Sequence, residues 1–221
     1  MDSGTKQAEY TRLRLRMVAE QIAGRGIINE RVLDAMREVP RHLFVAPQLR
    51  HLAYEDGPLP IGENQTISQP YIVALMTQLL GLRGDENVLD VGVGSGYQTA
   101  ILSLLAREVV GLERIQTLAE QAARRLDELG YENVTIHVGD GSQGLPDQAP
   151  FDAILVAAAS PGVPAPLSAQ LAGGGRLVIP IDDGQGQMLE RITRKGDALH
   201  VEQVVPVRFV PLRGKHGFAG E

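Results

Sequence analysis

The sequence predicts an α/β fold with a mainly parallel central sheet, an antiparallel pair of strands at its edge and a helical extension in front. Between residues 87 and 181, five apolar strand-like runs are separated by helical stretches. A chain that returns through helices lays successive strands parallel. Two further runs, 188–194 and 200–209, follow without an intervening helix and predict the antiparallel pair. A glycine-rich turn ends the first strand, and 221 residues suffice for one substantial core.

Composition excludes several classes of function. A net charge of −6 argues against a nucleic-acid partner, which would favour a basic face. The sequence has no cysteine, so disulfides and thiol chemistry are excluded, and its five histidines lack metal-ligand spacing. The polar start and the lack of any apolar run near ~20 residues predict neither a secretory signal nor a membrane span. We expect a cytoplasmic protein with no metal, no nucleic acid and no membrane partner.

Residues 1–56 predict a helical N-terminal extension. We expect a frayed start over 1–8 and then a helix over 10–23, where apolar residues recur at helical spacing before two glycines. Asn29 can cap a second helix that ends before a proline, and a short third helix is expected over 47–54. The extension could cover a site as a lid or simply pack beside the sheet.

Residues 57–80 predict a loop followed by a helix. The stretch 57–67 contains two prolines and two glycines, which is typical of an extended, irregular loop. Ser68 suits the N-cap of the helix that follows, and Pro70 is tolerated in its first turn because its missing N–H would have no helical partner.

Residues 81–181 predict the ligand-binding core of a single domain that spans 1–221, and residues 182–221 supply the edge strands and a C-terminal segment. The expected strands are 87–91, 108–112, 134–138, 153–156 and 176–181. One expected helix follows the first strand and ends near 106, and two others span 115–129 and 164–171. Three glycines precede the last strand.

The turn after the first strand predicts a site where a ligand approaches the backbone. Gly92, Gly94 and Gly96 alternate with small residues, and glycine lets the chain take unusual angles at the start of a helix. The dinucleotide fingerprint would need a glycine where Tyr97 stands, which disfavours a nicotinamide cofactor. Asp90, just before the turn, suits a cationic or amino-bearing ligand better than a pyrophosphate.

Acidic residues follow the next two strands as well. Glu113 could accept hydrogen bonds from both hydroxyls of a ribose, and Asp140 could bind an adenine amino group. Together with Asp90 they stand at the carboxyl ends of successive parallel strands, where open α/β sheets bind ligands. The pattern therefore predicts a nucleoside site. Ser68 lacks the context of a hydrolase nucleophile.

With these residues placed, the chain resembles the protein-L-isoaspartate O-methyltransferase family over residues 10–218. Residues 88–99 resemble its first motif for S-adenosyl-L-methionine (AdoMet). The more specific match is Leu59-Pro60-Ile61-Gly62 with Gln65-Thr66-Ile67-Ser68-Gln69-Pro70, a segment that other AdoMet methyltransferases lack. Further matches lie at 39–41, 44–45, 139–141, 151–154, 174–180 and 207–212. The resemblance implies a Rossmann-like class I methyltransferase fold.

The resemblance also implies roles for individual residues. It implies that Ser68 is the active-site residue, beside both the methyl donor and the substrate carboxylate. Implied cofactor contacts are Gln65, Thr66, Ile67, Ser68, Asp90, Gly92, Gly94, Gly96, Glu113, Asp140 and Gly141. Implied substrate contacts are Leu59, Pro60, Ile61, Ala157, Ala158, Val210, Pro211 and Leu212. Asn64 stands where a glycine is common, and Val93 where a threonine or small residue is common.

The implied activity is methyl transfer from AdoMet to the free carboxylate of L-isoaspartyl residues in damaged proteins and peptides, with S-adenosyl-L-homocysteine (AdoHcy) as product. The methyl ester would then pass through a succinimide towards normal aspartate. We expect isoaspartyl proteins as partners and favour a monomer. The alternatives are an AdoMet methyltransferase for another carboxylate or nucleophile, a non-catalytic relative that binds AdoMet or damaged peptides, and a nicotinamide oxidoreductase.

Overall fold

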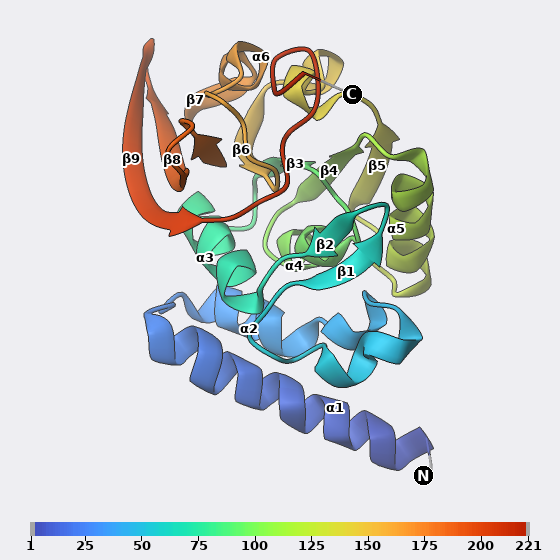
Figure 1. Ribbon diagram of the computed structural model, residues 1–221. Coiled ribbons are helices and arrows are strands. Elements are labelled where there is room, and N and C mark those ends of the chain that lie inside the picture. Colours follow the sequence, from blue (N-terminus) through green and yellow to red (C-terminus); the bar gives the residue numbers. More distant parts are fainter. Residues whose placement is uncertain (1–2, 220–221) are drawn as a thin grey trace.

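A computed structural model describes residues 3–219 and contains one large, mostly parallel sheet with two antiparallel strands at one edge (Figure 1). Its strands are β3 (Asn87–Val91), β4 (Glu108–Glu113), β5 (Val134–Val138), β6 (Phe151–Val156), β7 (Leu171–Asp182), β8 (Gln187–Lys195) and β9 (Ala198–Val207). Their order across the sheet is β5-β4-β3-β6-β7-β8-β9. The strands β3 to β7 pair in parallel, and β8 and β9 pair antiparallel, so the predicted fold class is confirmed.

Helices cover the sheet and build a core on each of its faces. They are α1 (Ser3–Met17), α2 (Glu30–Glu38), α3 (Pro70–Leu80), α4 (Tyr97–Ser103), α5 (Gln116–Glu128) and α6 (Ala165–Ala169). Because side chains alternate along a strand, Val88 and Leu155 join the core with α2, α3 and α4, whereas Leu89 and Ile154 join the core on the opposite face. No helix among residues 3–219 is long and apolar enough to cross a membrane.

The N-terminal extension begins earlier than the sequence indicated. Helix α1 is already formed from Ser3, so the expected fraying over 3–8 is wrong, and residues 1–2 lie outside the described part. A π-helical turn (Val18–Ile22) and a 3₁₀ turn (Ala23–Arg25) carry the chain on to Gly26, whose φ of 93° ends the helix. The Asn29 side chain accepts a hydrogen bond from the Val32 N–H at the start of α2, which confirms the predicted cap.

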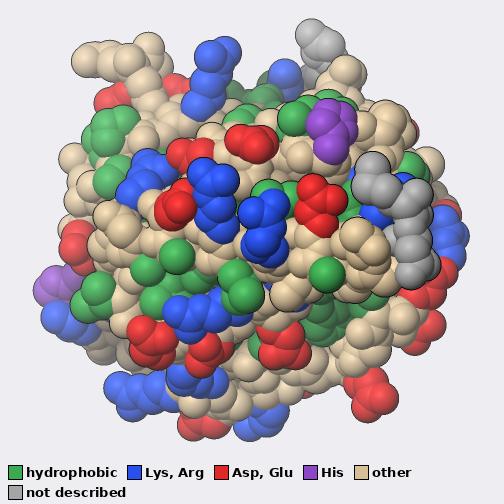
Figure 2. All heavy atoms as spheres, turned by 90° about the horizontal axis from the view of Figure 1, so that it is seen from below, with side chains coloured by type: hydrophobic (Ala, Val, Ile, Leu, Met, Phe, Trp, Pro, Cys, Tyr) green, Lys and Arg blue, Asp and Glu red, His purple; other side chains and the backbone are tan. Residues whose placement is uncertain are grey.

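The extension packs along one side of the molecule, beneath α3 and α4 (Figure 1). Its buried residues Met17, Ile22 and Met36 belong to the same core as the helices above it. Seen from below, its outer face carries positive and negative side chains interspersed, with small apolar patches between them (Figure 2). The expected third helix is a 3₁₀ helix over Pro47–Leu52.

The stretch predicted to be an irregular loop is a β-hairpin, so that prediction is wrong. Strands β1 (Leu59–Gly62) and β2 (Gln65–Ile67) pair antiparallel, with an irregularity between Pro60 and Gly62. Proline is tolerated here because the hairpin is only two strands wide and both strands are edges. The turn places Glu63 and Asn64 at φ 51° and 56°, in the left-handed region. Asparagine is one of the few side chains that accept this region readily, which explains why it can replace the glycine common there.

Several further boundaries differ from the prediction. Helix α4 ends at Ser103 rather than near 106, α6 spans Ala165–Ala169 rather than 164–171, and β9 spans Ala198–Val207 rather than 200–209. Helix α3 begins at Pro70 with Gln69 at its N-cap, so Ser68 does not cap it. Strand β7 begins at Leu171 rather than 176, because the glycines 173–175 lie inside it as an irregularity opposite β6. A side chain at Gly175 would stand 2.9 Å from the Ala172 carbonyl oxygen, so only glycine fits this bend.

Candidate active site

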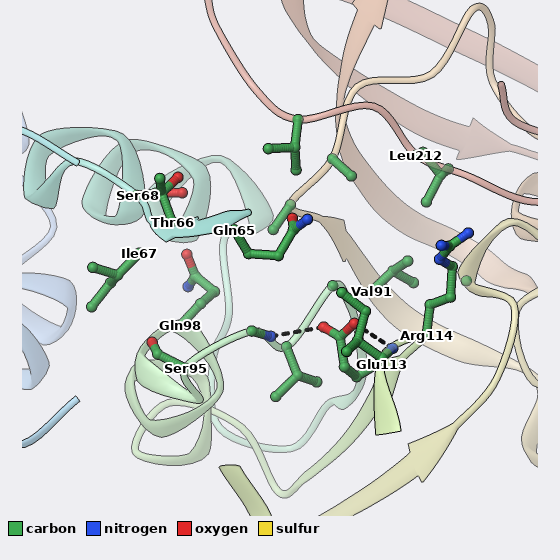
Figure 3. A pocket seen from close by; sticks show the side chains of 18 of the residues that line it. Gln65, Thr66, Ile67, Ser68, Val91, Ser95, Gln98, Glu113, Arg114 and Leu212 are labelled. Atoms are coloured by element: carbon green, nitrogen blue, oxygen red, sulfur yellow. Dashed lines mark hydrogen bonds between the residues drawn. The ribbon is translucent and has the colours of Figure 1, made fainter. Parts of the chain in front are cut away.

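A cavity of about 510 Å³ lies at the carboxyl ends of β3, β4 and β6, beside the hairpin (Figure 3). Its walls come from the hairpin, α3, the glycine turn with the start of α4, the end of β4, the chain just after β5 and β6, and the segment after β9. The predicted residues that line it are Gln65, Thr66, Ile67, Ser68, Gly92, Gly94, Glu113, Gly141, Ala157, Ala158, Val210, Pro211 and Leu212. The predicted sites on separate segments are thus largely brought together.

The glycine turn forms the floor of the cavity. Gly92, Gly94 and Gly96 have φ values of 89°, 53° and 87°, which side chains rarely adopt. Gly92 and Gly94 line the cavity. Gly96 does not. A Cβ there would meet Ala122 and Leu126 at 3.4 Å, so this glycine lets α5 pack closely against the turn.

Glu113 holds the turn in place and faces the cavity. Its Oε2 accepts a hydrogen bond of 2.9 Å from the Gly94 N–H, and its Oε1 accepts one of 2.9 Å from the Ile115 N–H (Figure 3). A carboxylate oxygen can accept more than one hydrogen bond, so both oxygens keep acceptor capacity. The side chain can therefore receive a pair of hydroxyl groups, as a ribose would present them.

Asp90 lies behind the turn and does not line the cavity. It is fully buried, and its Oδ2 accepts a hydrogen bond of 2.6 Å from the Thr99 hydroxyl. Its Oδ1 has no partner among residues 3–219. Burial raises the pKa of Asp90 to about 7, and the nearby charge of Glu113 acts in the same direction, whereas the Thr99 hydrogen bond opposes the shift. Through its hydrogen bond with Thr99, Asp90 holds the start of α4 in place.

Asp140 also stands outside the lining, although its neighbour Gly141 is part of it. Its carboxylate accepts hydrogen bonds from the Ser142 N–H and hydroxyl, the Gln143 amide and the Lys215 N–H. Burial alone would raise the pKa of Asp140, but these hydrogen bonds, led by that from Lys215, outweigh it and lower the pKa. The carboxylate thereby anchors the C-terminal segment beside the cavity.

Ser68 stands between this cavity and a second one of about 430 Å³. The second cavity is lined by residues of the hairpin, α3 and the chain from the end of β9: Pro58, Thr66, Ser68, Gln69, Ile72, Ala157, Pro206, Val207, Arg208, Phe209 and Val210. Because Ser68 is not a helix cap, its hydroxyl makes no hydrogen bond to the residues that the structure describes. It is free to contact a molecule in either space.

The predicted β1 contacts are not brought into either cavity. Leu59 and Pro60 pair with Ile67 and Thr66 in the hairpin, and Ile61 packs near Gly94, where a Cβ would meet its Cδ1 at 3.2 Å. These residues therefore hold β2 against the glycine turn.

Other lining residues escaped prediction. On the helices these are Val73, Met76, Tyr97 and Gln98, and elsewhere they are Glu63, Asn64, Val91, Val93, Ser95, Leu112, Arg114, Ile115 and Arg213. Gln98 lies inside the first AdoMet motif at 88–99, and Arg114 directly follows Glu113, so their positions gave a signal. In the sequence, Val73 and Met76 look like ordinary apolar positions of a helix, so nothing there indicates that they line a cavity.

Comparisons with known proteins identify a matching family and close sequence relatives of this chain. The chain matches the model of the family described as protein-L-isoaspartate(D-aspartate) O-methyltransferase (PCMT) over residues 14–217. It is 58% identical over 206 residues to a protein-L-isoaspartate O-methyltransferase from Trichlorobacter lovleyi, covering 93% of this chain and 95% of the relative. It is 55% identical over 206 residues to one from Roseiflexus sp., covering 93% and 94%.

Solved structures agree with the sequence relatives. One protein-L-isoaspartate O-methyltransferase aligns with a TM-score of 0.82 at 28% identity, covering 94% of this chain and 67% of its own. Another, from Plasmodium falciparum in complex with AdoHcy, aligns with a TM-score of 0.79 at 28% identity, covering 90% and 98%. From its sequence and its fold alike, the chain belongs to the protein-L-isoaspartate(D-aspartate) O-methyltransferase family.

Proposed function

We propose that this enzyme holds AdoMet in the 510 Å³ cavity and the isoaspartyl residue in the 430 Å³ cavity, with Ser68 at the boundary between them. The reaction transfers a methyl group from AdoMet to the free carboxylate of an L-isoaspartyl residue in a damaged protein or peptide. The ester converts through a succinimide towards normal aspartate. The observation that carries the proposal is the position of Ser68, which lines both cavities together with Thr66, Ala157 and Val210.

The residues that line the larger cavity suit the chemistry of AdoMet. We assign Glu113 to the ribose hydroxyls, because its two oxygens retain acceptor capacity after holding the turn. Gly92 and Gly94 let the backbone approach the ligand, and Gly141 leaves room for the base. A Cβ at Gly141 would stand 2.5 Å from a methyl group of Val91, so this position requires glycine.

The remaining predicted cofactor residues take two kinds of role in this proposal. The strand β2, with Gln65, Thr66 and Ile67, covers the ligand from the hairpin side. Asp90, Gly96 and Asp140 act from behind the lining. Asp90 holds the start of α4 through Thr99, and Asp140 holds the C-terminal segment through Lys215.

When bound, AdoMet supplies an activated methyl group on a sulfonium. The isoaspartyl carboxylate is ionised at neutral pH, so no residue has to remove a proton from it. The residues then act by alignment, which can lower a barrier by ~7–11 kcal/mol. In this scheme the Ser68 hydroxyl donates a hydrogen bond to one carboxylate oxygen and leaves the other facing the methyl group. A strongly cationic pocket would instead stabilise the charged ground state.

The substrate chain would run over the apolar wall formed by Ala157, Ala158, Val210, Pro211 and Leu212. Small and apolar side chains exclude water without selecting a particular neighbouring residue, which suits an enzyme that meets many protein sequences. We place this activity in the cytoplasm, in a monomer that has no nucleic-acid partner, in keeping with the net charge of −6.

A methyl-transfer assay tests the proposal. Purified enzyme and AdoMet are incubated with a peptide that contains L-isoaspartate, with the same peptide containing aspartate, and with a small dicarboxylic acid. We expect methyl ester only on the isoaspartyl peptide. Methylation of the small acid in preference would favour another carboxylate methyltransferase, and binding of the peptide without turnover would favour a non-catalytic relative.

A further inference from the structure

The helical wall of the AdoMet cavity contains one polar side chain, Gln98. Helices α3 and α4 contribute Val73, Met76, Tyr97 and Gln98 to the lining. The Tyr97 hydroxyl points away from the cavity, towards the Met36 sulfur at 3.9 Å. Gln98 is itself buried, with 9% of its surface exposed, so its amide group needs partners.

A chain of hydrogen bonds fixes which way this amide points. The Thr77 hydroxyl donates its only proton to the Val73 carbonyl oxygen at 2.7 Å, within α3. It can therefore only accept from its other neighbour, and the Gln98 Nε2 donates to it at 2.9 Å. The nitrogen is thus held against Thr77, and the oxygen is turned the other way, towards the hairpin side of the cavity (Figure 3). Among residues 3–219, no donor bonds to this Oε1.

An oriented amide oxygen that faces the cavity favours a hydrogen-bond donor, and most of all a cationic one. With Glu113 at the ribose, the part of the cavity beyond the glycine turn receives the amino-acid portion of the cofactor. The apolar side chains of Val73 and Met76 offer nothing to a buried ammonium there. We propose that the Gln98 Oε1 accepts a hydrogen bond from the α-ammonium of AdoMet, with Thr77 as the residue that positions the amide. This inference rests on the proposed placement of the cofactor.

Calorimetric titration of the full-length enzyme with two ligands tests the assignment. AdoHcy carries the ammonium, and 5′-methylthioadenosine has the same nucleoside and sulfur but no amino-acid portion. The variant Gln98→Met keeps the side-chain volume and removes the acceptor. We expect its Kd for AdoHcy to rise roughly 10- to 150-fold, as for one hydrogen bond to a charged group, and its Kd for methylthioadenosine to stay unchanged.

Thr77→Val is the second variant, because it removes the hydroxyl and keeps the shape. It should show the same selectivity with a smaller loss, since the amide then turns freely. Gln116→Met makes the same chemical change at an exposed position of α5 and should alter neither affinity. Retained binding of methylthioadenosine reports that each variant is folded around the nucleoside site.

Two results would overturn the assignment. One is an unchanged AdoHcy affinity in Gln98→Met, and the other is an equal loss for both ligands. A loss seen with AdoMet but not with AdoHcy would also overturn it, because only AdoMet carries the charged sulfur. Glu113→Gln separates this failure from that of the placement itself. If it weakens both ligands, the cofactor lies where we propose; if it weakens neither, the placement is wrong.

Discussion

Ser68 does not cap helix α3, because the helix begins one residue later than a serine cap would require. In the sequence, Ser68-Gln69-Pro70 reads as a cap followed by a first turn. The helix instead takes Gln69 as its N-cap, and the Gln69 carbonyl accepts the Val73 N–H at 3.1 Å. The pattern predicts the start of a helix correctly. It does not decide which residue is the N-cap, because both Ser68 and Gln69 stand just before Pro70.

For Ser68, the proposed role predicts a loss of rate rather than of cofactor binding. Ser68→Ala removes one hydrogen bond to a charged oxygen, which is worth ~1.5–3 kcal/mol, or roughly 10- to 150-fold in turnover. The AdoHcy affinity should change little, because the ribose and the base are held elsewhere. Steady-state kinetics on an isoaspartyl peptide, together with calorimetry, checks both. Turnover near that of the wild type would rule out an orienting role.

Among the acids, position after a strand does not by itself reveal which side chain faces the ligand. Asp90, Glu113 and Asp140 all stand at the carboxyl ends of parallel strands, and the sequence gives them equal standing. In the structure only Glu113 lines the cavity. The difference arises because the Asp90 side chain is directed to Thr99, and Asp140 turns to the C-terminal segment. These are tertiary contacts, and no local pattern encodes them.

Asp90 should make stability depend on pH. Its folded-state pKa of about 7 lies above its ordinary value of 3.8, so the folded protein binds the extra proton. The contribution of Asp90 is therefore fully present below about pH 4 and is lost as the pH rises through 7. Asp90→Asn keeps the shape and the acceptor for Thr99 but cannot titrate. Urea unfolding at several pH values should show that the free energy of unfolding of this variant, taken relative to that of the wild type, increases as the pH rises towards 7; an unchanged difference would mean that Asp90 is ionised in the fold.

At the scale of elements, periodic segments were predictable and the hairpin was not. Strands β3 and β5 were predicted with their observed bounds, because their apolar runs are bounded clearly by glycine or polar residues. The hairpin contains Pro60, directly follows Pro58 and has only short strands, so its local signal is that of a loop. It forms because Ile61 and Ile67 are drawn to the core next to the glycine turn.

The hairpin turn predicts a sharp difference between two substitutions of Asn64. This residue has a φ of 56°, where a β-branched side chain costs roughly 1–2 kcal/mol. Asn64→Val should lower the free energy of unfolding by about that amount and weaken AdoHcy binding, because Asn64 and β2 line the cavity. Asn64→Gly should leave both close to the wild type. Denaturant titration and calorimetry measure the two effects, and equal behaviour of the two variants would show that the turn is not held in this conformation.

At the scale of the whole molecule, the site depends on a closure that joins the end of the chain to the middle of the sheet. The Leu212 N–H donates to the Ala159 carbonyl, and the Ala159 N–H donates to the Val210 carbonyl. This brings the segment after β9 back across the carboxyl end of β6. The sequence predicted the antiparallel pair but not its order in the sheet, because nothing local indicates which edge a strand joins. The order β7-β8-β9 is what lets the following segment reach the cavity.

The N-terminal extension holds a second titrating group, whose effect on stability opposes that of Asp90. His42 is buried, with its Nδ1 at 2.7 Å from the Tyr54 hydroxyl and its ring stacked on Tyr10 at 4.0 Å. Burial first, and then the charges of Arg50 and Arg14, lower the pKa of His42 from 6.5 to about 4. As the pH falls, the unfolded chain therefore binds this proton at a higher pH than the folded protein does. The contribution of His42 is present above about pH 6.5 and is lost as the pH falls through 4.

The two groups thus act in opposite directions over nearly the same range of pH. Between pH 4 and 6.5, Asp90 makes folding less favourable as the pH rises, and His42 makes it more favourable, so their effects largely cancel in the wild type. Each single variant should expose the other group. In Asp90→Asn the free energy of unfolding should rise with pH across this range, and in His42→Gln, which keeps a polar partner for Tyr54, it should fall. Urea titrations of both variants and of the double variant measure the slopes. The double variant should return to the flat profile, and single-variant slopes of the same sign would contradict the opposed pair.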